Sequence, residues 1–170
     1  RFLPGDIAVR AAEKVADDFH ARYCATGKHY RYTLLRDPVR SPLERHTSWR
    51  VKALLNLDLM TQSCAILTGV HDFAAFRGAG CSSAVTQKEI YAISLTEEDA
   101  LLYVDFYGSG FLRHMVRMMV GTLVEVGRGR RTVESLKLML EDPAGAPAAI
   151  TAPPQGLCLM SVDYGTRQSG

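Results

Sequence analysis

Three side chains that can carry positive charge lie within an apolar stretch, GSGFLRHMVRMMVGTLVEVG (residues 108–127). The periodicity of its apolar residues predicts a helix over 111–126, apolar around nearly its whole circumference with one narrow polar seam. Arg113, His114 and Arg117 lie in the first turns of this predicted helix, where the helix dipole favours anions over cations. Their position therefore calls for a specific chemical explanation.

Arg117 lies on the polar seam of the predicted helix, and burying it without a partner would cost several kcal/mol. One explanation is structural, in which Arg117 pairs with a carboxylate of the same core; Asp72 and Asp105 are the internal candidates. The other is functional, in which the guanidinium points into a site that holds an anion. The helix alone leaves both open.

Composition indicates one globular domain over residues 1–170, since 47% of the residues are hydrophobic, 22% are charged and the net charge is only +2. No apolar run is long enough to span a membrane and no secretory signal pattern is present, so we expect a cytoplasmic protein. The four cysteines include no CxxC pair, and the five histidines form no HExxH motif. We therefore expect reduced thiols and no bound metal.

Positive charge is concentrated in the first third of the chain. Residues 1–52 hold eleven Lys or Arg against six Asp or Glu, and 22–52 alone hold eight against two. Four aromatic residues interleave with these cations: Tyr23, Tyr30, Tyr32 and Trp49. Because phosphates need cations and unpaired bases need stacking surfaces, this mixture indicates a nucleic-acid interface; a solvated basic face is the alternative.

Periodicity and turn signals divide the chain into strands and helices. Strands are predicted over 28–35, 86–95, 100–108 and 156–164, helices over 57–68, 111–126 and 132–142, and loops over 71–80 and 143–154. Asn56 and Thr132 are expected to cap the starts of their helices, and an acidic turn at 96–99 is expected to join the two middle strands. Residues 8–23 fit either a strand or a short helix.

This order, strand-helix-strand-strand-helix-strand, predicts an α+β fold. We expect a ferredoxin- or RRM-like antiparallel four-stranded sheet with its helices packed on one face. RNA-binding modules of this layout stack bases on the other, open face. The fold hosts many functions, so order alone does not assign one.

Five stretches together resemble the tRNA pseudouridine synthase A (TruA) family. They are LPGDIAV (3–9), DDFHARYCATGKHYRY (17–32), HDFAAFRG (71–78), GFLRHMVRMMVGTLVEVG (110–127) and TAPPQGLCLMSVDY (151–164). They occur in the family's order and approximate spacing, from residue 3 to residue 164.

The resemblance implies an enzyme that isomerises uridine to pseudouridine at positions 38 to 40 of the tRNA anticodon arm. It implies a homodimer that holds tRNA between its subunits, without metal or organic cofactor. The family's catalytic aspartate lies in a Gly-Arg-Thr-Asp motif in the N-terminal half, and no aspartate of this chain follows Arg-Thr. We therefore expect the chain to be a C-terminal domain that is inactive without the missing N-terminal domain.

The resemblance also implies roles for two residues. The family's active-site tyrosine corresponds to Tyr30, which would pack against the target base and help to move its C5 proton. The family's active-site arginine corresponds to Arg117, which would pair with the absent aspartate and lower its pKa. A cation without a local partner is expected if that partner belongs to another domain.

Six further side chains are predicted to contact tRNA: Arg22, Lys28, Arg31, Arg77, Arg113 and His114. Each could instead be a solvated surface charge. Two competing hypotheses remain for the whole chain: a non-catalytic RNA-binding module that uses an RRM-like sheet, and a structural or dimerising domain.

Overall fold

The computed structural model of this chain describes residues 3–145 and 148–165. The strands are β1 (Gly27–Leu35), β2 (Trp49–Arg50), β3 (Gly69–Asp72), β4 (Gln87–Glu98), β5 (Leu101–Gly108) and β6 (Leu157–Asp163). The helices are α1 (Leu57–Leu67), α2 (Met115–Gly127) and α3 (Val133–Glu141). The predicted α+β class is confirmed.

One mixed sheet contains all six strands. Its main strands lie in the order β6-β1-β5-β4 and pair antiparallel throughout, which is the arrangement of a ferredoxin-like sheet. The predicted count of four strands was too low. Short β3 extends the sheet beyond β4, and two-residue β2 pairs parallel with the end of β1. β3 also takes up the start of the segment predicted as a loop over 71–80.

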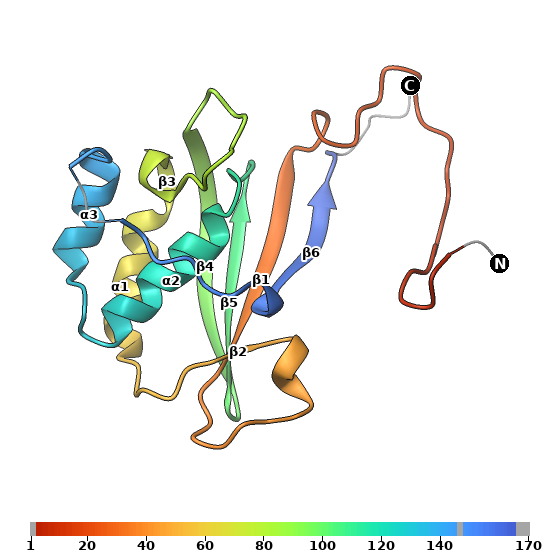
Figure 1. Cartoon of the computed structure of the whole chain (residues 1–170). Coiled ribbons are helices and arrows are strands. Elements are labelled where there is room, and N and C mark those ends of the chain that lie inside the picture. Colours follow the sequence, from red (N-terminus) through yellow and green to blue (C-terminus); the bar gives the residue numbers. More distant parts are fainter. Residues whose placement is uncertain (1–2, 146–147, 166–170) are drawn as a thin grey trace.

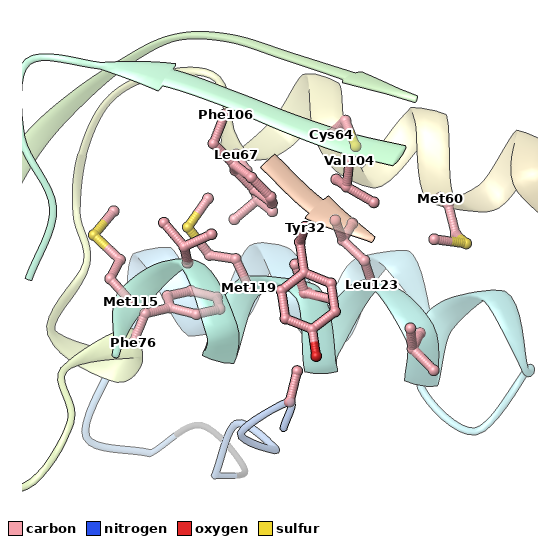
Figure 2. Close-up of a cluster of buried hydrophobic side chains, with 14 of the residues drawn as sticks. Tyr32, Met60, Cys64, Leu67, Phe76, Val104, Phe106, Met115, Met119 and Leu123 are labelled. Carbon is pink, nitrogen blue, oxygen red and sulfur yellow. The ribbon is translucent and has the colours of Figure 1, made fainter. Parts of the chain in front are cut away.

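The three helices gather on one face of the sheet, as predicted (Figure 1). Between them and the strands lies a single core of buried apolar side chains, part of which is shown in Figure 2. β1 and β5 supply their alternate residues to it, including Tyr32, Val104 and Phe106, all with 0% exposure. The intervening residues of these strands therefore face the opposite side of the sheet.

Local signals for helix starts are confirmed. Asn56 Oδ1 accepts a hydrogen bond from the backbone N–H of Leu59 at 3.0 Å, and Thr132 Oγ1 accepts one from that of Ser135 at 3.1 Å. Each bond satisfies one of the amide groups that a helix start leaves without a partner. The predicted hairpin is confirmed, but its turn is shorter than 96–99, because β4 continues to Glu98 and only residues 99–100 separate it from β5.

Residues 3–26 contain neither the strand nor the short helix predicted for 8–23. They form an irregular segment with several turns that lies beyond β6 at the side of the sheet and reaches β1 near the end of β6 (Figure 1). Apolar side chains of this segment remain exposed, among them Ile7 and Val9. Without a neighbouring strand, its β-favouring residues have no ladder to join. Within the predicted loop 143–154, residues 146–147 lie outside the described part of the chain.

Candidate functional site

A cavity of about 700 Å³ opens where β1 and β5 approach the turn that leads into α2. Tyr30 of β1 and Phe111 line it, and their rings meet edge to face with centroids 5.2 Å apart. Tyr30 faces the same side of the sheet as Tyr32, but it is only partly buried. Burial raises the pKa of the Tyr30 phenol, so it stays protonated near neutral pH. The cavity thus offers a flat aromatic wall with a proton-bearing tip.

The rim of this cavity is cationic. Arg22, Lys28, Lys88 and Arg113 line it, whereas none of the described residues that line it is acidic. These side chains come from the segment before β1, from β1, from β4 and from the turn before α2. Four uncompensated positive charges around one aromatic wall suit a ligand that carries both phosphates and unpaired bases.

The turn before α2 presents Arg113 and His114 to this cavity. The predicted helix start at residue 111 was wrong, because α2 begins at Met115 and both side chains are exposed on the preceding turn. His114 adopts a left-handed backbone with φ 63°, which is uncommon for a residue other than glycine. Outside the helix, these two polar side chains avoid the cost of burial that the sequence pattern suggested.

Glycine at position 78 allows this turn to form. The N–H of Gly78 donates to the carbonyl oxygen of Arg113 at 2.9 Å, and a Cβ at position 78 would stand 2.8 Å from that oxygen. Arg113 Nη1 donates in turn to the carbonyl oxygen of Gly80 at 3.2 Å. The loop after β3 therefore holds the turn that carries Arg113 and His114.

Arg117 lies inside α2 and is partly buried, but it does not line the cavity. Its Nε donates to the carbonyl oxygen of Ala152 at 2.7 Å. Among the described residues no carboxylate forms an ion pair with Arg117, and both internal candidates are engaged elsewhere. Asp72 accepts from the backbone of Ala74, and Asp105 faces the other side of the sheet.

Arg31 lies on that opposite face, away from Lys28 and Tyr30. Its Nε and Nη2 donate to the two carboxylate oxygens of Asp105 at 2.9 and 3.1 Å, and His29 Nε2 lies 2.6 Å from Asp105 Oδ1. Arg31 also lies over the ring of Tyr103, while His29 stacks on Tyr107. Tyr103 and Tyr107 on this open face therefore already have stacking partners on one side.

The remaining predicted cation, Arg77, stands next to the cavity without lining it. Its Nη2 donates to the carbonyl oxygen of Cys81 at 2.8 Å, so this hydrogen bond joins two residues of the loop after β3. The Cys81 thiol lies at the cavity wall, where hydrogen bonds from the backbone of Arg113 and Ser83 lower its pKa. All four cysteines are free.

Sequence reasoning missed several residues of the cavity, among them Lys88 and Phe111. A signal for Lys88 was present: it stands two residues before the buried Ile90 in β4, so alternation places a cation on the core-facing side. Phe111 was assigned to the helix core, because its apolar side chain continues the periodicity of α2. Phe76, in the loop after β3, is fully buried in the core and does not line the cavity.

Residues 64–165 match the family described as tRNA pseudouridine synthase. This chain belongs to that family. It is 54% identical over 164 residues to tRNA pseudouridine synthase A of Syntrophotalea carbinolica, and 52% identical over 162 residues to that of Geobacter sulfurreducens. The protein of the same name from Moorella thermoacetica is 42% identical over 162 residues. The resemblance to the TruA family is thereby confirmed.

These alignments cover 95–96% of this chain, residues 1–170, but only 65–66% of the length of each relative. The chain therefore spans about two thirds of the length of these relatives. Among its described residues there is no cluster of three or more His, Cys, Asp or Glu that could hold a metal ion. Nor does this described part contain a helix long and apolar enough to cross a membrane.

Proposed function

We propose that this chain is the base-handling domain of a tRNA pseudouridine synthase that acts on positions 38 to 40 of the anticodon arm. The active unit would be a cytoplasmic homodimer in which an N-terminal domain, outside this chain, supplies the nucleophilic aspartate. The chain alone would be inactive, and no metal or organic cofactor takes part.

One observation carries this proposal: the partly buried Tyr30 lies in a cavity rimmed by cations and free of acids. An unpaired uracil can stack on or pack against the phenol, while its flanking phosphates meet Arg22, Lys28 and Lys88. The phenol is protonated, and among the described residues its hydroxyl makes no hydrogen bond. It is thus free to relay a proton at C5 of the base.

Arg117 complements this cavity as the ion-pair partner of the proposed aspartate. A guanidinium that lacks a carboxylate within the described residues is expected if its partner belongs to another domain. Opposite charge at close range would keep that aspartate ionised, as a nucleophile requires. We leave Arg31 outside this site, because Asp105 engages it on the other face of the sheet.

A map of pseudouridine in the anticodon arms of cells that lack the gene tests the proposal. Carbodiimide treatment followed by primer extension should show loss of modification at positions 38 to 40, with restoration by the intact gene. Restoration by Arg117→Ala should fail, although that protein should still bind tRNA. Unchanged modification in the deleted cells would contradict the proposal and favour a non-catalytic RNA-binding module.

A further inference from the structure

We propose that residues 150–153 form a positioning segment that aims the guanidinium of Arg117, and that Tyr32 fastens this segment. The inference rests on the proposed pairing of Arg117 with a catalytic aspartate. Neither Tyr32 nor residues 150–153 would touch the substrate. They would act only through the direction that they give to Arg117.

Two hydrogen bonds join the positioning segment to Arg117. The N–H of Ala152 donates to the backbone carbonyl of Arg117 at 3.0 Å, and Arg117 Nε donates to the carbonyl oxygen of Ala152 at 2.7 Å. Ala152 therefore forms hydrogen bonds with both the backbone and the side chain of Arg117. Ala152 has 0% exposure, so its backbone groups are shielded from water.

Occupation of Nε decides which edge of the guanidinium remains available. Among the described residues, the two Nη groups of Arg117 form no hydrogen bond or ion pair. Arginine commonly binds a carboxylate through two parallel N–H donors. Because Nε is bound to Ala152, the aspartate would accept hydrogen bonds from Nη1 and Nη2 rather than from Nε and one Nη.

Close approach of the segment to α2 requires glycine at position 121. A Cβ there would stand only 1.9 Å from the carbonyl oxygen of Ile150 and 3.3 Å from the nitrogen of Ala152. Both atoms belong to backbone, so they cannot rotate away as a side chain could. Gly121 lies one turn after Arg117 and thereby lets the segment reach it.

Tyr32 secures the other end of the segment from β1. Its ring has 0% exposure, and its hydroxyl donates to the carbonyl oxygen of Pro153 at 2.7 Å. Figure 2 shows this hydroxyl pointing out of the apolar cluster toward the loop that precedes β6. Tyr30 precedes Tyr32 by two residues on the same face of β1, so one strand serves the cavity wall and the anchor of Arg117.

Exchange of the Arg117 Nε–H proton, measured by ¹⁵N NMR of this chain, tests the geometry without any activity. Tyr32→Phe removes only the hydroxyl and should speed that exchange about tenfold, the loss expected for one hydrogen bond. Thr122→Val is the matched control, because it removes a buried hydroxyl that donates within α2 to Met118. Unchanged exchange in Tyr32→Phe, or equal acceleration in both variants, would overturn the inference.

Turnover by the complete synthase tests the consequence. Tyr32→Phe should lower kcat about tenfold to a hundredfold, as expected for a misaimed group, while the Kd for tRNA changes less than about twofold. Thr122→Val should leave both values unchanged. Loss of turnover in Arg117→Ala with normal turnover in Tyr32→Phe would overturn this inference alone. Normal turnover in Arg117→Ala would overturn the proposed function and the inference with it.

Discussion

Gly121→Ala should destabilise the protein, although alanine is the better helix former. The added Cβ would meet the carbonyl oxygen of Ile150 at 1.9 Å, so residues 150–152 would have to move away from α2. That movement breaks the bond from Arg117 Nε to Ala152, at about 1.5–3 kcal/mol, and the backbone bond between the same residues, at about 1 kcal/mol. Alanine is more favourable than glycine in a helix by about 1 kcal/mol, which offsets part of this loss. The expected net loss is about 1.5–3 kcal/mol in the free energy of unfolding.

Urea unfolding followed by tryptophan fluorescence measures this loss, because Trp49 is the single tryptophan and packs against the buried ring of Tyr32. Gly110→Ala is the matched control. No atom lies within 4 Å of a Cβ at position 110, so its stability should change by less than about 0.5 kcal/mol. A Gly121→Ala protein as stable as the wild type would refute the close packing of residues 150–152 on α2.

Three further outcomes are expected. Asn56→Ala should lower the free energy of unfolding by about 1 kcal/mol, measured in urea, because the Leu59 amide loses its cap; no change would deny the cap a role. Burial raises the pKa of Cys64 from 9.0 to about 12, so the unfolded chain deprotonates first and stability should fall between these pH values by about 1.4 kcal/mol per unit. In urea unfolding measured at several alkaline pH values, Cys64→Ala should make the free energy of unfolding fall less steeply with pH. An unaltered pH dependence would show that the Cys64 thiol does not cause this fall. Arg22→Ala should flatten the salt dependence of tRNA binding by about 0.7–0.9 in log–log slope, whereas Arg31→Ala should not; equal flattening would place RNA on both faces.

Several elements were readable from the sequence because their signals are local. Asn56 and Thr132 marked two helix starts through bonds that span only three residues. Alternation over 28–35 gave β1, and the order of strands and helices gave the ferredoxin-like arrangement. Alternation also places Arg31 on the other face from Lys28 and Tyr30, a signal that the prediction of tRNA contacts for all three did not use.

Other features depended on contacts between distant segments. The apolar periodicity of α2 extends back to residue 111, but the helix begins at Met115 because Gly78 packs against the turn at 113–114. Short β2 and β3 form only because longer strands stand beside them. Residues 8–23 form no regular element, since no strand lies alongside to pair with them.

The residues of the candidate site divide in the same way. Residue types and the family motifs indicated Tyr30 and Arg117 and the cations around them. Only the folded chain brings Lys88 of β4 to the cavity, pairs Asp105 with Arg31 on the other face, and sets Ala152 against Arg117. Local sequence fixes which backbone shape each segment prefers. Which side chains meet depends on how the segments pack, because burial and partner choice are properties of the whole core.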